Sequence, residues 1–421
     1  MIDYKLILKD KESVKRELAK KNFGEGKIDA LESVLIEMRA RKAEINELYR
    51  DKRARESERR LGEAGARTAR GRTPAMELLR ERIAAAEREL KQLEISAQAL
   101  LFEIPNLPDT VAPIGTDESA DVVLFEAPYY QECESGNPAP HWDVAEKLGI
   151  LDASCAGRIS GRGFGLFKGK GAKLIRALVN YCLSLHEGKY LELLPPHLVT
   201  TEALTMTGHL PKFVSDQYKC EKDDLWLIPT AEVPMTAAFA DTVFQKGSLP
   251  KYCMGYTLAF RREIGATGRG TRGLQRVHEF HKVELLKIVE PSMVQPELDD
   301  LLEDCVKIIR DLKLRYRIVE QCTGRMGDKY SRCFDIEVYS PGVKKWLEVA
   351  SVGHFSDYQA RRAGIKYIDE KGKKRTAFTM NGSGIATARV WLSIIETYQR
   401  ADGSVKVPEV LTPFMGCDSI Y

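Results

Sequence analysis

Residues 260–284, FRREIGATGRGTRGLQRVHEFHKVE, contain two strand-like runs that flank a loop rich in glycine and arginine. In such a hairpin Arg261 on one strand and Phe280 or Glu284 on its partner can face the same surface. A cation, a stacking ring and a carboxylate would then line one concave face of a sheet. The alternative is an exposed hairpin, but such a hairpin would not place Arg261 and Glu284 within apolar runs.

Two more charged residues lie in apolar surroundings. Glu232 belongs to TAEVPM, residues 230–235, which follows the apolar run at 225–228, an unexpected place for an acidic side chain. Residues 379–395, TMNGSGIATARVWLSII, are typical of a strand, a glycine turn and a helix. Arg389 would lie in the second turn of that helix among apolar neighbours, which favours an inward, functional arginine over a solvated one.

The segment GFGLFKGKGA is similar to a phosphate-binding loop but lacks its spacing. Gly165 and Gly169 enclose three residues where the motif needs four, and Gly171 follows Lys170 where a serine or threonine should stand. We interpret the segment as a turn into a helix.

The chain has 421 residues, 43% of them hydrophobic, and a net charge of +3, which predicts a soluble protein of two or three domains. Its apolar runs are too short for a membrane helix, and Asp3 and Asp10 argue against an import peptide, so we expect a cytoplasmic protein with no membrane partner. Nine cysteines are scattered singly without a Cys-x-x-Cys pair. They are typical of reduced core thiols, and no structural zinc is expected.

Apolar residues recur at steps of three and four within residues 31–49 and 76–100, which predicts an antiparallel helical hairpin with a turn near 62–74. Residues 50–72, near its tip, carry nine basic and four acidic residues. A solvated coiled-coil face is one interpretation. Eight arginines favour contact with phosphates instead, because the guanidinium pairs bidentately with phosphate. The candidate contacts are Arg53, Arg55, Arg59, Arg60, Arg67, Arg70 and Arg72.

A linker rich in proline and turn formers follows at 103–119. Beyond it, helices predicted at 170–187, 292–313 and 383–398 accompany a series of strand-like runs with short connections. Such a series predicts a mostly antiparallel sheet flanked by helices. We therefore predict an α+β protein with a helical arm domain, 1–109, and a second domain, 110–421, that contains this sheet.

These stretches together resemble the seryl-tRNA synthetases, which belong to class II of the aminoacyl-tRNA synthetases. The resemblance extends over the whole chain, from the helical hairpin to VPEVLTPFM at 407–415. The blocks TAE, FRRE and NGSG occur in this order, which makes the resemblance specific. It implies an ATP-dependent ligase that forms seryl-adenylate from L-serine, and then transfers serine to a serine tRNA with a long variable arm.

The resemblance also implies a role for individual residues. Arg261, Glu348 and Arg389 would be catalytic, and Mg²⁺ would be bound by Glu348 and Ser351. Serine would be held by Thr230, Glu232, Arg261, Glu284, Thr379, Asn381 and Ser383. ATP would be bound by Arg261, Arg262, Glu263, Val277, Phe280, Glu348, Val349, Ala350, Ser351 and Arg389. Because alternation puts Ala350 on the same side as Glu348, Ser351 reaches the metal only if the strand bends or bulges there.

Some positions depart from the family's usual residues, and we expect them near the site: His209, Arg325, Ala350, Val352, Gly353, His354 and Ala388. Two other functions therefore stay open. One is a paralogue that activates serine or a related amino acid for an acceptor other than tRNA, and the other is a silent tRNA-binding paralogue. The segment ELLPPHLV after helix 170–187 resembles the family's dimer motif, which implies a homodimer.

Overall fold

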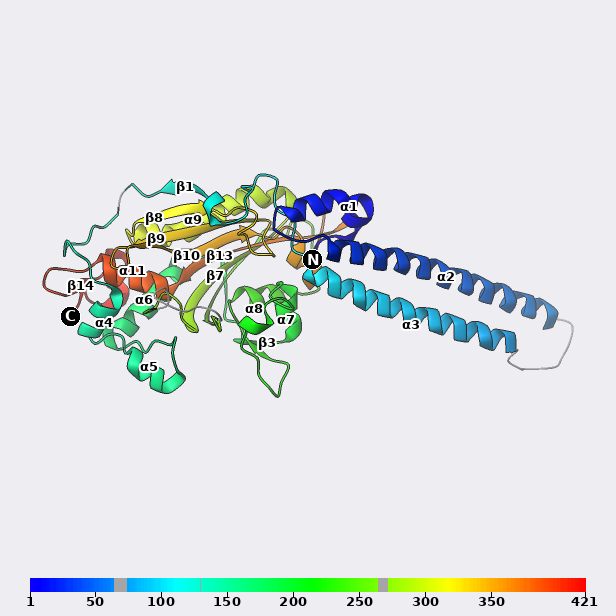
Figure 1. The fold of residues 1–421 in the computed structure, drawn as a ribbon, viewed down its shortest axis with the longest axis horizontal. Helices are drawn as coiled ribbons and strands as arrows, with labels where there is room; N and C mark the ends of the chain where they lie inside the picture. Colours follow the sequence, from blue (N-terminus) through cyan, green and yellow to red (C-terminus); the bar gives the residue numbers. More distant parts are fainter. Residues whose placement is uncertain (64–73, 129, 264–271) are drawn as a thin grey trace. The chain divides into compact units, whose positions relative to one another are not determined.

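The computed structural model describes residues 1–63, 74–128, 130–263 and 272–421 (Figure 1). For residues 58–63 it describes the backbone but not the side chains. The chain divides into two compact units. The smaller unit comprises Asp3–Ala19 and Phe23–Ile104. The larger comprises Pro105–Tyr421 together with Met1–Ile2 and Lys20–Asn22. The structural boundary thus lies five residues before the predicted one.

The smaller unit is a helical hairpin with an added helix. Helix α1 (Tyr4–Ala19) precedes the two long helices, α2 (Gly26–Glu63) and α3 (Pro74–Glu103). The spacing of apolar residues predicted this pair of helices. In the structure Ile45 and Leu48 of α2 pack against Leu79 and Ile83 of α3 in one apolar seam. At 1.5 Å per residue, α2 is about 57 Å long and α3 about 45 Å.

An eight-stranded sheet forms the centre of the larger unit, in the order β1-β8-β9-β10-β13-β7-β6-β2. All its neighbours are antiparallel except β2 and β6. The fold class is therefore the predicted α+β. The strands are β1 (Val122–Glu126), β2 (Leu191–Leu193), β6 (Lys251–Phe260), β7 (Glu279–Val289), β8 (Tyr316–Glu320), β9 (Arg332–Ser340), β10 (Lys345–His354) and β13 (Phe378–Ala386).

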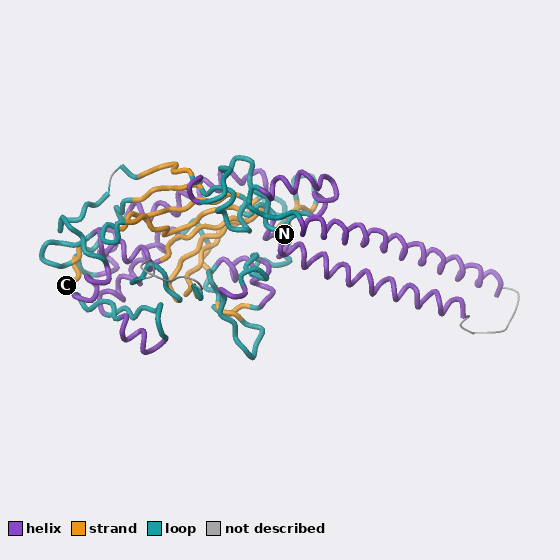
Figure 2. The backbone as a smooth tube through the Cα atoms, in the orientation of Figure 1, coloured by secondary structure: helices purple, strands orange, loops and turns teal. Residues whose placement is uncertain are grey.

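Helices α6 (Gly169–His186), α9 (Val294–Asp311) and α11 (Thr387–Thr397) pack on the sheet (Figure 2). Alternation along the strands separates an apolar side from a polar one. In β7, Val283 and Leu285 are buried in the core with residues of these helices, whereas the intervening Glu284 lines a cavity. The helices thus supply the core, and the other side of the sheet is left for polar side chains.

The remaining elements are short and surround this frame. The helices are α4 (His141–Lys147), α5 (Ala153–Ser160), α7 (Thr201–Met206), α8 (Glu232–Ala237), α10 (Tyr358–Ala363) and α12 (Thr412–Met415). The strands are β3 (Leu198–Val199), β4 (Trp226–Leu227), β5 (Val243–Phe244), β11 (Lys366–Ile368), β12 (Lys374–Thr376), β14 (Val405–Lys406) and β15 (Ser419–Ile420).

The NGSG block was predicted as a turn, and that prediction was wrong. It lies inside β13, so α11 begins only at Thr387 and Arg389 is in its first turn rather than its second. The glycines allow close packing instead: a Cβ on Gly382 would lie 2.5 Å from the sulfur of Cys305, and one on Gly384 would lie 3.0 Å from another sulfur. The segment 165–171 does turn into helix α6, as predicted.

A fully buried carboxylate ties α11 to α4. Glu396 accepts hydrogen bonds from the His141 ring (Nδ1, 2.7 Å), the hydroxyl of Ser340 and the amide of Gly342 (2.9 Å). The other ring nitrogen of His141 accepts from the amide of Leu274 (3.0 Å), a residue that lines the cavity. Since Nε2 accepts, Nδ1 must carry the proton.

Replacing Glu396 with glutamine should lower the free energy of unfolding by about 2–3 kcal/mol. The neutral amide keeps one acceptor oxygen but turns an NH2 donor toward groups that already donate. Urea denaturation of the variant and the parent measures the difference. Equal midpoints would show that the carboxylate contributes no stability.

Candidate active site

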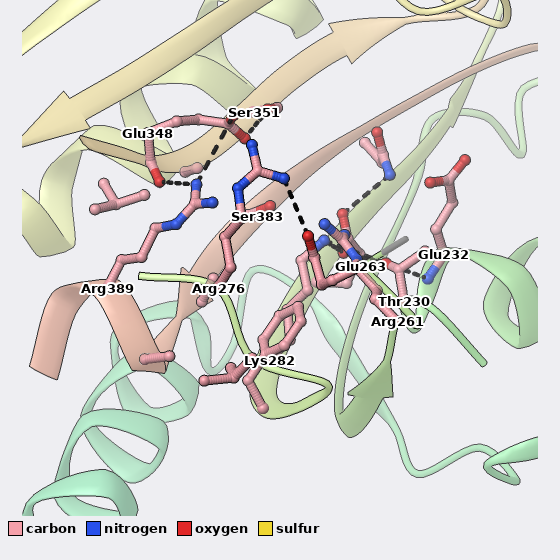
Figure 3. A pocket seen from close by; sticks show the side chains of 18 of the residues that line it. Thr230, Glu232, Arg261, Glu263, Arg276, Lys282, Glu348, Ser351, Ser383 and Arg389 are labelled. Carbon is pink, nitrogen blue, oxygen red and sulfur yellow. Dashed lines mark hydrogen bonds and ion pairs between the residues drawn. The ribbon is translucent and has the colours of Figure 1, made fainter. Parts of the chain in front are cut away.

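A cavity of about 290 Å³ lies on the polar side of the sheet (Figure 3). Strands β7, β10 and β13, the start of α8, the first turn of α11 and Arg261, which directly follows β6, contribute to its wall. Predicted site residues that line it are Thr230, Glu232, Arg261, Glu263, Val277, Phe280, Glu284, Glu348, Val349, Ala350, Ser351, Asn381, Ser383 and Arg389. Residues almost 160 positions apart in the sequence are thus brought together.

Arg261 and Phe280 form a stacked pair in this wall. The Arg261 guanidinium carbon lies 5.2 Å from the ring centroid of Phe280, because Arg261 directly follows β6 and its amide bonds the carbonyl of His278 (2.9 Å). The predicted shared face of the hairpin is confirmed. Arg276 adds a second guanidinium and pairs with Glu263 at 3.0 Å. A planar ligand carrying phosphates would find a ring and two cations here.

Strand β10 bulges near Glu348, which meets the condition stated above for Ser351 to share the side of Glu348. Glu348 pairs with Glu337 of β9 and Ala350 with the adjacent Ile336, so one extra residue is accommodated in β10. The bulge brings the Ser351 hydroxyl to Glu348, where it donates to Oε1 at 2.9 Å. Both oxygen-bearing side chains therefore line the cavity, as Figure 3 shows.

Arg389 reaches the same place from α11. Its Nη1 donates to the Glu348 backbone oxygen (2.6 Å) and lies 3.9 Å from the carboxylate, and its Nε donates to the Gln275 carbonyl (3.0 Å). Burial lowers the pKa of Arg389, yet the guanidinium remains charged at neutral pH. Despite burial, Arg389 holds the pKa of Glu348 below its ordinary value.

A second carboxylate, missed from the sequence, lies behind Glu348. A carboxylate oxygen of Asp335 in β9 lies 2.9 Å from the Ser351 hydroxyl oxygen, and Arg325 contacts Asp335 at 2.9 Å. Burial and the charge of Glu348 raise the pKa of Asp335 to about 7. Arg325 also bonds Asp121 at 2.6 Å, so this departure from the family pattern acts on the electrostatics of the site.

The other end of the cavity holds a hydrogen-bonded carboxylate. Glu284, 1% exposed, accepts from the Thr230 hydroxyl (2.6 Å) and the Asn381 amide (2.9 Å) and pairs with the ammonium of Lys282. Lys282 also donates to Thr230 at 3.2 Å. Strand alternation could have revealed Lys282, because it lies two residues before Glu284 on the same face.

Glu232 is equally enclosed, at 2% exposure. Its carboxylate accepts from Lys329 (Nζ, 2.7 Å to Oε1) and from Gln359 (Nε2, 2.6 Å), so both its oxygens have donors. Burial opposes ionisation of Glu232, but the Lys329 ammonium overcomes this and holds its pKa at about 2. Lys329 lies in an irregular loop, where no periodic pattern marks an inward side chain.

Two predicted site residues lie outside the cavity wall. Arg262 points to the ring of Tyr218, with its guanidinium carbon 5.9 Å from the centroid. Thr379 is fully buried and donates to Gln359 (2.9 Å), which in turn bonds Glu232. Thr379 can therefore act on a ligand only through these neighbours.

Some of the residues that depart from the family pattern also line the cavity, and others do not. His209, Ala350 and Ala388 line the cavity as expected. Val352 is packed in the apolar core instead, and His354 bonds Asp109 at 3.2 Å. This contact lowers the pKa of Asp109 to about 2.

Only part of the arm's arginine cluster can be placed. Arg53 and Arg55 are exposed, and Arg55 pairs with Asp51 at 2.8 Å within its helix. The side chains of Arg59 and Arg60, and the whole of Arg67, Arg70 and Arg72, lie outside the described residues.

Two searches of the described residues found nothing. No group of three or more histidine, cysteine or acidic side chains in these ranges could hold a metal ion. Within the same ranges, no helix is both long and apolar enough to cross a bilayer. The nine cysteines are free thiols.

Comparisons with known proteins agree with this geometry. Residues 217–398 match the tRNA synthetase class II core domain (G, H, P, S and T), and residues 1–108 match the seryl-tRNA synthetase N-terminal domain. A serine–tRNA ligase of Thermomicrobium roseum is 41% identical, with 99% of this chain and 94% of the relative covered. One from Cyanothece sp. is 39% identical over the full length of both.

A solved structure, the seryl-tRNA synthetase of Pyrococcus horikoshii complexed with ATP, superposes with a TM-score of 0.91. It is 29% identical, with 100% of this chain and 99% of that one covered. The sheet, its cavity and the core match define a class II aminoacyl-tRNA synthetase, a ligase. Full-length identity narrows the class: the chain belongs to the seryl-tRNA synthetase family, which joins serine to tRNA.

Proposed function

We propose that this chain activates L-serine with ATP to form seryl-adenylate, and then transfers serine to the 3′ end of a serine tRNA. The observation that carries this proposal is the single cavity with two chemically distinct ends. One end has the stacked Arg261–Phe280 pair beside Glu348 and Arg389, and the other has two buried carboxylates, Glu232 and Glu284. The first suits a nucleotide and the second a small amino acid with a hydroxyl.

At the amino-acid end, Glu232 and Thr230 receive the α-ammonium of serine. Glu284 receives its hydroxyl, while Asn381 and Ser383 complete the wall. Thr379 positions Gln359 rather than touching serine. A site built to bond a hydroxyl leaves buried polar groups unpaired when alanine binds, so it discriminates against alanine.

At the nucleotide end, Phe280 stacks on adenine, Val277 packs beside it, and Arg261, Glu263 and Arg389 contact ATP. Arg261 also binds the serine carboxylate and the α-phosphate, and Arg389 binds the γ-phosphate. The serine carboxylate is ionised at neutral pH, so its attack on the α-phosphorus needs no general base. In-line positioning and cancellation of charge are sufficient, and the two arginines supply both.

The oxygen donors near Arg389 fit Mg²⁺. Glu348 and Ser351 offer a carboxylate and a hydroxyl, and Mg²⁺ commonly takes one or two protein carboxylates together with substrate phosphates. Burial and then the charge of Glu348 raise the pKa of Asp335, and a cation bound at Glu348 would offset the second of these. When bound, Mg²⁺ would neutralise phosphate oxygens of ATP.

Serine-dependent exchange of pyrophosphate into ATP tests activation, and subsequent transfer to serine tRNA tests the second step. The proposal expects both. Exchange without transfer would favour an amino-acid-activating paralogue with another acceptor. Neither activity, with tRNA binding retained, would favour a silent paralogue. The family's role in protein synthesis supports a cytoplasmic location.

The arm is the proposed contact for a tRNA with a long variable arm. Its exposed arginines suit a phosphate backbone, and its tip lacks aromatic residues that could stack on bases.

Deleting residues 50–72 should weaken tRNA binding and remove much of its salt dependence, since each lost phosphate contact reduces the salt slope by about one. Pyrophosphate exchange should stay near the parent rate, because the deleted tip lies tens of ångströms along the helices from their other end. Filter binding at several salt concentrations measures the first, and exchange kinetics the second. Equal loss of both would mean that the arm supports the fold instead.

We also propose a homodimer. The hydrophobic side chains of Leu191, Leu194 and Leu198 are exposed in the segment after α6, at 42–80%, which is unusual for three leucines so close together. Light scattering at micromolar protein should give about twice 47.4 kDa. A monomer that still charges tRNA would contradict this prediction.

A further inference from the structure

An ammonium group already occupies the place proposed for the α-ammonium of serine. The Nζ of Lys329 lies 2.7 Å from Glu232 Oε1 and also contacts Oε2. It lies 5.4 Å from the ring centroid of Tyr330 and 5.2 Å from that of Phe355. A carboxylate and two ring faces are the groups that bind alkylammonium ions, so the structure contains a formed ammonium site filled by the chain's own lysine.

The surroundings of this site are built into the fold. Tyr330 packs against strand β10, where a Cβ on Gly353 would lie 2.7 Å from a carbon of the ring. The absence of a side chain at Gly353 therefore allows the tyrosine to reach its position. Tyr330 and Phe355 are tilted against each other with centroids 5.0 Å apart, which fixes the two rings beside the lysine.

The charges of this end of the cavity balance without a ligand. Glu232 and Glu284 are matched by Lys329 and Lys282. His209, which also lines the cavity, adds no charge at neutral pH because burial, and then Lys329, lower its pKa to about 3. The four charged side chains thus leave no unpaired anion for an incoming α-ammonium.

We infer that Lys329 determines the amino-acid affinity of this site by occupying the α-ammonium position, so that serine binds only by displacing it. This inference rests on the proposed function. The lysine side chain is 16% exposed and lines the cavity, so it has a path out, and its flexible four-carbon stem permits the movement. When serine binds, its ammonium replaces that of Lys329 at Glu232. The apparent affinity for serine is therefore the intrinsic affinity multiplied by the fraction of molecules in which Lys329 is displaced.

The test is the Michaelis constant for serine in pyrophosphate exchange. Lys329→Ala and Lys329→Met should each lower the KM for serine by about tenfold or more, because the competing ammonium is gone. The KM for ATP and the maximal rate should change by less than about threefold, since neither depends on this displacement. Methylammonium, used as a free substitute for the lysine head, should raise the serine KM of Lys329→Ala but not of the parent.

Lys212→Ala is the matched control, because Lys212 is half-exposed, pairs with Asp328 and lies outside the cavity wall. It should leave the serine KM unchanged. An unchanged or higher serine KM in both Lys329 variants, with folding confirmed by thermal melting, overturns the inference and leaves serine activation intact. Exchange that appears only in the Lys329 variants supports it in its strongest form. No exchange in any protein overturns the proposed function and this inference together.

Discussion

Glu284→Ala should lower kcat/KM for serine activation by about 30- to 1000-fold, equivalent to roughly 2–4 kcal/mol of transition-state stabilisation. The carboxylate is 1% exposed and is the acceptor for Thr230, Asn381 and Lys282. Its removal takes away the proposed partner of the serine hydroxyl and leaves the Lys282 ammonium without its counter-ion. The ratio of serine to alanine activation should narrow at the same time.

Two variants separate these effects. Glu284→Gln keeps the shape of the side chain and one acceptor oxygen, so it should lose less stability than Glu284→Ala yet still lose serine activation. Glu221→Ala, at an exposed position, should change neither stability nor kinetics. Pyrophosphate exchange with serine and with alanine, together with a melting curve, gives the comparison. An unchanged serine–alanine ratio in folded Glu284→Ala would remove Glu284 from the hydroxyl subsite.

Regular strand periodicity explains which parts of this site could be predicted. The facing of Arg261 and Phe280 follows from hairpin pairing. Alternation shows that Ser351 shares a side with Glu348 only where the strand bends or bulges, and β10 has such a bulge. Alternation also marks Lys282, which we did not identify. Where a side chain lies on a regular strand, its direction is fixed by its distance in sequence from a known neighbour.

The failures come from contacts that no local pattern encodes. Glycines in β13 were interpreted as a turn, because sequence alone does not distinguish a turn from the close approach of Cys305 to Gly382. Lys329 reaches Glu232 from an irregular loop, through tertiary packing. Asp335 belongs to the site through its contact with Ser351 on the neighbouring strand β10. Arg262 immediately follows Arg261, yet it points to Tyr218 instead, because adjacent side chains of extended backbone diverge.

Arg389→Ala should reduce the maximal rate of pyrophosphate exchange by at least about 100-fold, comparable to the loss of one preorganised charge donor in other enzymes. The guanidinium is fixed from two directions, by the carbonyl of Gln275 on Nε and by the backbone of Glu348 on Nη1. It therefore needs little reorganisation when charge develops on the phosphates. Its removal also leaves the Glu348 carboxylate without the cation that lowers its pKa.

Arg389→Lys tests whether charge alone is sufficient. A lysine has no planar fork to meet both carbonyls, so it should recover only part of the lost rate. Arg310→Ala is the control, since Arg310 is half-exposed and pairs with Glu303 on the surface of α9. The KM for serine should be similar in all these proteins, because Glu232 and Glu284 lie at the other end of the cavity. A loss confined to serine affinity, with the maximal rate intact, would contradict a role for Arg389 at the phosphates and place it with the amino-acid subsite.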